Sequence, residues 1–258
     1  MIHFQRTTLS NGLRVLVHED TSIPIVAVNV AYQVGSRDEH PQHTGLAHLM
    51  EHFMFTGSPN APDYDSVLQK VGAVNNAYTS QDLTNYYIIL PAGNLETALW
   101  LESDRMLALR FEQTSLDVQK QVVIEEFKEN YLNRPYGDLM MLFYGMVYQK
   151  HPYQWLPIGK ETDHISTVDM DMIRKFHSTY YRPDNAVLVV AGNVHAEEVF
   201  MLADKWFGDI PAGNLPQRHY PVEEPQTVAR LQVVHRDVPT PVLVKGWNMC
   251  NLLHPDYY

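Results

Sequence analysis

Two histidines and a glutamate lie close together in the sequence, at His48, Glu51 and His52. On a helix, residues four apart share a face, so both imidazoles can reach one metal ion and Glu51 lies beside them. The opposite side of the same helix is apolar, with Leu46, Leu49, Met50 and Phe53. A histidine pair at this spacing, without the glutamate, more often lies on a solvated helix face with no metal. The added glutamate on an otherwise apolar helix favours a metal site that lines a cleft.

A catalytic zinc site built on two histidines needs a third protein ligand and one position left open for water. The best source is the helix expected over residues 115–132, with Thr114 or Ser115 as its N-cap. This helix carries Glu125, Glu126 and Glu129. Spacing alone does not choose among these three carboxylates.

The composition narrows the kind of metal site and the class of protein. The chain has 258 residues, of which 45% are hydrophobic and 19% charged, as in a globular protein. Its single cysteine, Cys250, excludes an internal disulfide and a zinc site made of several thiolates. Structural zinc usually takes several thiolates, so the donors available here favour a catalytic site.

Charge and hydropathy exclude two classes of partner. The formal net charge of −11 argues against nucleic acid, because binding phosphates needs a basic surface. No apolar run approaches the roughly 20 residues that span a bilayer, so we expect no membrane partner. Residues 1–13 lack the apolar centre of a secretory signal. We therefore expect a cytoplasmic protein, unless a longer precursor carries an export signal.

The pattern of apolar residues predicts an α+β fold, a mostly antiparallel sheet covered by helices. Residues 4–9 and 13–18 flank the turn Ser10-Asn11-Gly12, which predicts a hairpin. The nearly continuous apolar run 25–34 predicts a strand buried on both faces. Further strands are expected at 73–79, 84–90 and 186–191. Helices are expected at 45–55, 64–71, 95–109, 115–132, 135–148, 168–180 and 196–207.

The motif and its surroundings resemble the pitrilysin superfamily, which includes insulin-degrading enzyme and mitochondrial processing peptidase. The order His-x-x-Glu-His at His48 to His52 is that of the inverzincins. The similarity covers nearly the whole chain and is carried by residues 9–13 (LSNGL), 35–39 (GSRDE), 45–53 (GLAHLMEHF), 76–79 (NAYT), 122–126 (VVIEE), 181–185 (YRPDN) and 189–193 (VVAGN).

The resemblance implies a LuxS/processing-peptidase-like metallohydrolase half-domain that binds one Zn²⁺ per chain. Its site residues, carried over by position, are the metal ligands His48, His52 and Glu126, the general base Glu51, the substrate-binding residues Asn76, Ala77 and Tyr78, and Gln119 and Glu129 around the metal. Gln119 departs from the pattern, because many members carry a glutamate there. The implied domains are a zinc-binding half at 1–210 and the start of a second homologous half at 228–258. The proline-rich composition of residues 211–227 predicts a linker between them, and the residue pattern predicts strands at 229–234 and 241–248.

The implied function is that of a zinc metalloendopeptidase, which hydrolyses extended, unstructured peptides with Glu51 as general base. The second half would lie in the same chain or in a partner chain, and this chain alone is expected to lack full activity. One alternative is a non-catalytic, peptide-binding subunit of a two-subunit peptidase. Such relatives usually lose metal ligands, whereas the motif residues are all present here. Another alternative, zinc with a structural role alone, would leave Glu51 without a purpose.

Overall fold

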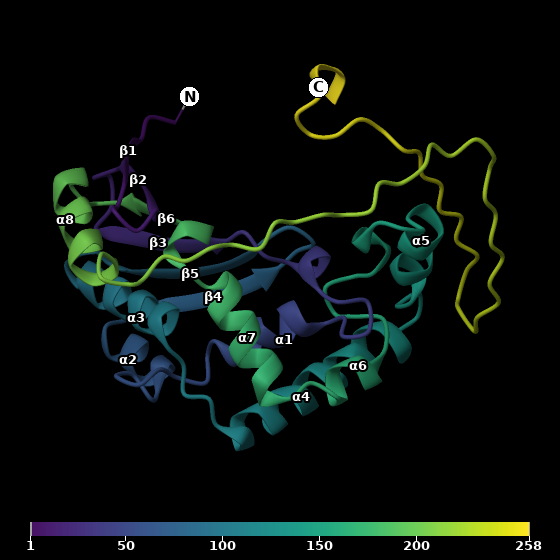
Figure 1. Cartoon of the computed structure of the whole chain (residues 1–258), viewed down its shortest axis with the longest axis horizontal. Helices are drawn as coiled ribbons and strands as arrows, with labels where there is room; N and C mark the ends of the chain where they lie inside the picture. Colours follow the sequence, from purple (N-terminus) through teal and green to yellow (C-terminus); the bar gives the residue numbers. More distant parts are fainter. Residues whose placement is uncertain (1, 258) are drawn as a thin grey trace.

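In the computed structural model, which describes residues 2–257, the strands form one mixed sheet (Figure 1). Within these residues the sheet has six strands in the order β1-β2-β6-β3-β5-β4. Their bounds are β1 Gln5–Thr8, β2 Arg14–Glu19, β3 Ile25–Tyr32, β4 Val74–Thr79, β5 Thr84–Pro91 and β6 Ala186–Gly192. β2 and β6 run parallel, and the other neighbouring pairs are antiparallel. The predicted α+β class with a mostly antiparallel sheet is confirmed.

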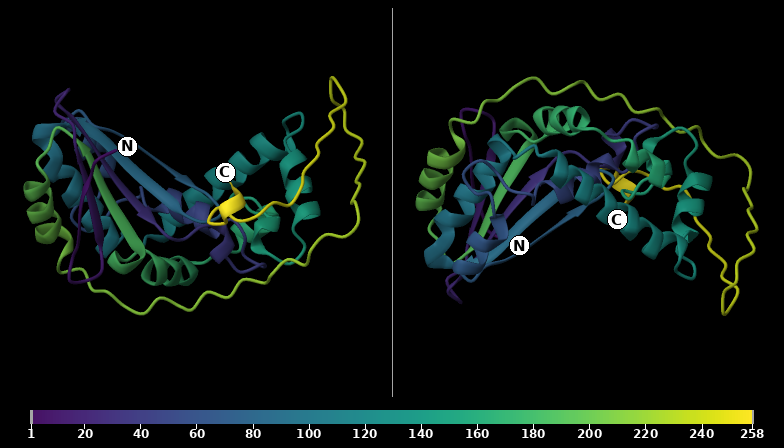
Figure 2. Two further views of the ribbon diagram at one scale, coloured as in Figure 1. Left: turned by 90° about the horizontal axis from the view of Figure 1, so that it is seen from above. Right: turned by 90° about the horizontal axis from the view of Figure 1, so that it is seen from below.

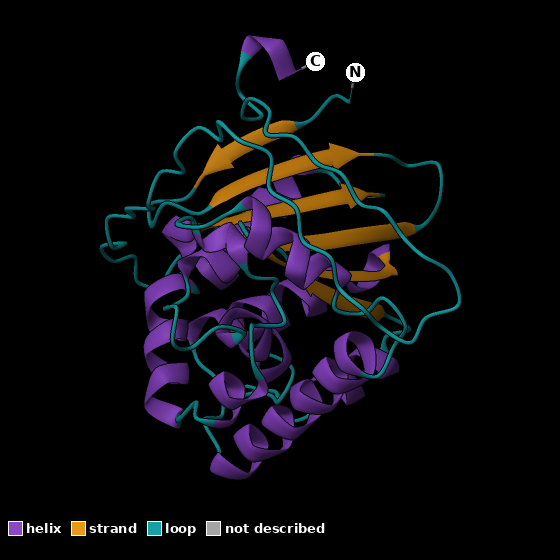
Figure 3. Cartoon of the chain, turned by 90° about the vertical axis from the view of Figure 1, so that its right-hand side faces the viewer, coloured by secondary structure: helices purple, strands orange, loops and turns teal. Residues whose placement is uncertain are grey.

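The helices gather on one side of this sheet (Figure 3). Their bounds are α1 Leu46–Phe53, α2 Tyr64–Lys70, α3 Leu95–Leu107, α4 Gln113–Phe127, α5 Leu139–Val147, α6 Thr162–Ser166, α7 Met170–Tyr180 and α8 Ala196–Phe207. The core fills the space between the sheet and these helices. On β3, for example, Val26, Val28 and Val30 are completely buried, while the residues between them are partly exposed. The prediction that this strand is buried on both faces is therefore wrong, because helices cover one face.

Several predicted helix boundaries also shift. The helix expected from residue 115 begins at Gln113, with Glu112 as its N-cap, and continues after Phe127 as a π-helical turn, Lys128–Leu132. The helix expected over 135–148 begins later, at Leu139. The side chain of Asp169 caps α7 through the Met172 amide, so α7 begins at Met170 and α6 is separate from it.

The strands predicted at 229–234 and 241–248 are not formed. From Asn193 to Tyr257 the described chain contains no strand, and after α8 it runs along the body as an extended segment (Figure 2). In the described chain these residues pair with no strand, and a strand is stable only with partners. Large apolar side chains of this segment are exposed, including Leu231 at 85%, Trp247 at 82% and Leu253 at 93%.

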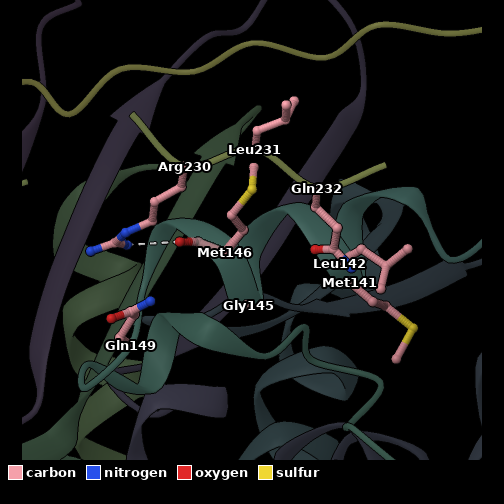
Figure 4. Close-up of a pocket in the computed structure, with 8 residues that line it drawn as sticks. All are labelled: Met141, Leu142, Gly145, Met146, Gln149, Arg230, Leu231 and Gln232. Atoms are coloured by element: carbon pink, nitrogen blue, oxygen red, sulfur yellow. Dashed lines mark hydrogen bonds between the residues drawn. The ribbon is translucent and has the colours of Figure 1, made fainter. Parts of the chain in front are cut away.

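Polar contacts nevertheless attach the extended segment to the helices. The Arg230 guanidinium donates to the carbonyls of Met146 and Val147 at 2.8 and 3.0 Å, which satisfies free carbonyls at the end of α5 (Figure 4). Upstream, Arg218 lies 3.0 Å from the Asp38 carboxylate, and the Tyr220 hydroxyl donates to the same side chain. Among residues 2–257, no helix combines the length and apolar character that crossing a membrane requires.

Candidate metal centre

Two helices bring three possible metal ligands together. His48 and His52 extend from one face of α1, and Glu126 extends from the last turn of α4. One ligand atom from each of these residues lies within 4.8 Å of the other two. Oε2 of Glu126 is 3.7 Å from Nε2 of His48 and 3.5 Å from Nε2 of His52. The donor set of two imidazoles and one carboxylate is one that catalytic zinc sites use.

The other two acids of the same helical segment lie outside this cluster. Glu125 pairs with Lys128 at 2.7 Å, and its side chain is 67% exposed. Glu129 lies in the π-helical turn and is exposed. The structure therefore brings Glu126 to the histidines, a choice that spacing in the sequence left open.

Burial and charge suit the three side chains to a cation. Burial lowers the pKa of His48 to about 4, so its imidazole is neutral near neutral pH and free to bind a metal. Burial also acts to lower the pKa of His52, but its interactions with Glu126 outweigh this and raise it. The interaction with His52 lowers the pKa of Glu126, which keeps the carboxylate ionised. The buried Nδ1 of His48 has no hydrogen-bond partner within the described chain.

The start of α1 is fixed by a residue that the sequence interpretation missed. Glu39 is 6% exposed, and its carboxylate accepts hydrogen bonds from the backbone N–H groups of Gly45 and Ala47 at 3.0 and 2.8 Å. The Trp155 indole donates to it as well, at 3.0 Å. Burial raises the pKa of Glu39 to about 8. An acid several residues before a helix gives little signal in a sequence, because usual caps adjoin the helix directly.

Gly45 is required at the same point for two reasons. Its φ of +90° is one that side chains with a Cβ rarely adopt, and a Cβ would lie 2.9 Å from the Ile158 carbonyl oxygen. Together, Glu39 and Gly45 set where the helix begins, and with it the position of His48 one turn later.

Glu51 lies on α1 between the two histidines in sequence, yet it is not one of the three clustered ligands. It is 8% exposed, and its carboxylate accepts a hydrogen bond from the Thr79 hydroxyl. Burial raises the pKa of Glu51. A buried carboxyl with a raised pKa, beside a possible metal site, has the character of a proton-transfer group.

The residues predicted to bind substrate lie on β4, at the end of the strand order. The outer edge of β4 pairs with no other described strand. Asn76 and the 52%-exposed Tyr78 alternate with Ala77 and Thr79, which lie toward the helices. The Asn76 side chain accepts a hydrogen bond from the Ala77 amide at 2.8 Å. Gln119, on α4, interacts with His52.

Comparison with protein families identifies two matching regions. Residues 14–149 match the model of the insulinase family, peptidase family M16, and residues 167–258 match that of the M16 inactive domain. The first region contains the histidine pair, Glu51 and Glu126. The predicted resemblance is thereby confirmed.

Individual relatives agree with the family assignment. The chain is 38% identical over 240 residues to the zinc protease PqqE of Helicobacter pylori, and this match covers 90% of the chain and 53% of the relative. It is 28% identical to the mitochondrial-processing peptidase subunit beta of Caenorhabditis elegans, over 81% of the chain and 45% of the relative. The chain thus spans about half the length of the curated relatives it matches.

Solved structures give the same result for the fold. The crystal structure of a protease from Helicobacter pylori superimposes with a TM-score of 0.79 at 35% identity, over 86% of this chain and 53% of that one. The first half of the periplasmic protease PqqL from Escherichia coli superimposes with a TM-score of 0.77 at 24% identity, which supports the fold alone. The chain belongs to the insulinase family, peptidase family M16.

Proposed function

We propose that this chain is the metal-binding half of a zinc metalloendopeptidase that hydrolyses extended, unstructured peptides. The observation that carries the proposal is the convergence of His48, His52 and Glu126, with the buried Glu51 beside them. Three protein ligands leave room for a water at a zinc ion, as hydrolysis requires. Similar proteins that are named zinc proteases support the same chemistry.

Each residue of the centre has a defined part in the proposal. His48, His52 and Glu126 would hold the zinc ion. When bound, zinc activates a water molecule and polarises the carbonyl of the bond to be cleaved. Glu51 takes a proton from the attacking water and delivers it to the leaving amine, first as general base and then as general acid. Its raised pKa helps it to hold that proton between the two steps.

The proposed position for the substrate is the free outer edge of β4. A peptide laid there would add a strand and bond main chain to main chain, which gives affinity with little dependence on sequence. Tyr78 and Asn76 would lie beside alternate substrate side chains on one face. Ala77 and Thr79 would lie on the face toward the metal centre. A segment inside a folded protein is held by its own packing and cannot lie extended along this edge, so unstructured peptides are the expected substrates.

Full activity in this proposal also needs a second homologous half, in the same or in a partner chain. The solved relatives that this chain matches extend to about twice its length. The exposed apolar side chains after residue 228 are consistent with a surface that another part of the protein covers. A second half would close over the peptide and hold it in register with the attacking water, on which the rate depends strongly.

The alternative function, a peptide-binding subunit without catalysis, needs no proton-transfer group. The buried Glu51 beside the ligand cluster favours the peptidase. A direct test is metal analysis together with cleavage of an unstructured peptide, by this chain alone and by the protein that also contains the second half. We expect one zinc ion per chain in both, and efficient cleavage in the second. Removing zinc with a chelator should stop cleavage and adding it back should restore it. A metal-free protein, or cleavage that survives chelation, would contradict the proposal.

A further inference from the structure

The hydroxyl of Thr79, the last residue of β4, donates a hydrogen bond to Oε2 of Glu51. We propose that Thr79 is a positioning residue, which holds the Glu51 carboxylate in the orientation that proton transfer requires. The inference rests on the proposed function, in which Glu51 is the proton-transfer group. Within the described chain, its hydroxyl donates to Glu51 and to none of the three clustered ligands.

The direction of the Thr79 side chain follows from the register of the sheet. Successive side chains of a strand point to opposite faces, so Asn75, Ala77 and Thr79 share one face of β4. Thr79 is paired with Thr84 of β5, which is completely buried. Because α1 lies against β4 on this face, the threonine hydroxyl meets the helix at Glu51.

The end of β4 is fixed by the turn that follows it. The Ser80 amide donates to the Leu83 carbonyl at 2.8 Å, and the Ser80 hydroxyl oxygen accepts from the amides of Asp82 and Leu83 at 3.2 and 3.1 Å. The Ser36 amide donates to the Ser80 carbonyl at 3.1 Å. Gly35 allows this close approach, because a Cβ there would lie 2.4 Å from the same carbonyl oxygen. Thr79 therefore lies between its pairing with Thr84 and this fixed turn, and its hydroxyl is held at a constant position.

A general base gains from such a contact because its carboxylate rotates about several bonds. The carboxylate must lie within hydrogen-bond reach of the proton it takes, and small misplacements cost up to about 100-fold in rate. The hydrogen bond from Thr79 also leaves the second oxygen, Oε1, available for the water. The strand proposed to hold the substrate is then the same strand that orients the base, so peptide and base are aligned by one element.

Two substitutions separate the hydroxyl from the shape of the side chain. Thr79→Val keeps the branched shape and removes the hydroxyl, whereas Thr79→Ser keeps the hydroxyl. In the zinc-loaded protein that cleaves peptide, we expect Thr79→Val to lower kcat about 10- to 100-fold, with KM changed by less than about threefold. Thr79→Ser should stay within about threefold of the unchanged protein. The zinc content should be the same in all three.

A matched control is Thr84→Val, which removes another threonine hydroxyl from the same strand pair. The Thr84 hydroxyl donates to the Val34 carbonyl at 2.9 Å and not to Glu51. We expect this variant to unfold at a lower temperature while its kcat stays within about threefold of the unchanged protein. An equal loss of kcat in Thr84→Val and Thr79→Val would reduce the role of Thr79 to general packing and overturn the inference.

A second readout does not depend on turnover. Acetohydroxamic acid binds metal ions and gives its proton to a neighbouring carboxylate, so its affinity reports the orientation of Glu51. By calorimetry, we expect about tenfold weaker binding to zinc-loaded Thr79→Val and nearly unchanged binding to Thr79→Ser. Equal affinity in both variants, or a Thr79→Val kcat within about threefold of the unchanged protein, would overturn the inference. If the zinc-loaded protein with its second half cleaves no peptide, the proposed function fails, and this binding comparison still shows whether Thr79 orients the Glu51 carboxylate.

Discussion

Two groups of ionisable side chains on the helices of this chain differ in how their members are paired. In one group, Glu102 and Arg105 of α3 are each about 1% exposed and pair directly, with Nε of Arg105 donating to Oε2 of Glu102 at 3.0 Å. In the other group, Oε2 of Glu126 lies 3.7 Å from His48 and 3.5 Å from His52, and Glu126 is partly exposed.

The buried pair is closed off by its surroundings. The rings of Phe55, Tyr64 and Tyr86 lie 5.3, 4.7 and 4.4 Å from the Arg105 guanidinium carbon, which places a cation against aromatic faces. The Tyr64 hydroxyl donates to Glu102 at 2.8 Å. A water or substrate has no access to charges held in this way. We infer that the pair has a structural role, whereas the open cluster keeps its ligand atoms available for a cation and a reaction.

The largest expected effect is on the rate of hydrolysis and comes from replacing Glu51, the proposed general base beside the open cluster. Glu51→Gln should leave the zinc content near that of the unchanged protein and lower hydrolysis by about 10³-fold or more, because a glutamine cannot take up a proton. Metal analysis and peptide turnover on the same samples check this. Substantial turnover in a zinc-loaded Glu51→Gln protein would remove Glu51 from the mechanism and weaken the contrast between the two groups.

The next largest effect is expected at the closed pair, and on stability instead of catalysis. Arg105→Met leaves the buried Glu102 carboxylate without its cation, which should lower the free energy of unfolding by about 3–5 kcal/mol. Replacing both residues, as Glu102→Leu with Arg105→Met, should recover part of this loss. Denaturant unfolding of the two variants measures both values. A double variant less stable than Arg105→Met would show that Glu102 stabilises the fold without its cation, and that the two residues do not act as a closed pair.

A smaller effect, on metal affinity, distinguishes two adjacent acids of α4. Glu126→Gln should weaken zinc binding by more than about 100-fold, beyond the loss typical of residues outside the ligand set. Glu125→Gln is the matched control, since Glu125 pairs with Lys128 at the surface, and it should bind zinc nearly as the unchanged protein does. Competition with a chromophoric chelator gives both affinities. The reverse result would assign the third ligand to Glu125.

The sequence predicted those parts of the site that depend on local periodicity. The histidine pair and its apolar opposite side define α1 without any knowledge of the fold. Whether Glu125 or Glu126 faces the histidines depends on how α4 is rotated against α1, which local periodicity does not predict. The choice of Glu126 therefore came from the family resemblance. Glu39 contacts α1 from the loop that precedes the helix, and Thr79 contacts it from the sheet. Neither contact follows from helical or strand periodicity, so the sequence pattern does not predict them.

The extended segment after residue 228 shows where prediction from the sequence pattern fails. Its apolar residues predict two strands, yet in the described chain neither segment pairs with a strand. A β-strand depends on partners that lie elsewhere, whereas a helix such as α1 satisfies its backbone within itself. For this reason the helix prediction was accurate within a turn and the prediction of these two strands was wrong.

The smallest expected effect concerns His177, which lies against the closed pair. It is 5% exposed, and its Nε2 lies 3.0 Å from the Arg105 carbonyl oxygen, so the neutral ring donates there. Burial lowers the pKa of His177 to about 4, from about 6.5 in an unfolded chain. Between these values the unfolded chain binds a proton that the folded chain does not, so stability falls as the pH falls through this window.

From pH 7 to pH 5 this difference amounts to about 2 kcal/mol at about 1.4 kcal/mol per pH unit. His177→Gln keeps an amide donor for the Arg105 carbonyl and does not titrate. Urea unfolding of the metal-free proteins should therefore show a steeper acid loss for the unchanged chain than for this variant. His48, whose pKa burial also lowers, titrates equally in both and cancels in the comparison. Parallel pH profiles would mean that His177 gains its proton in the folded chain, and that the interior around Arg105 is more open to water than its burial indicates.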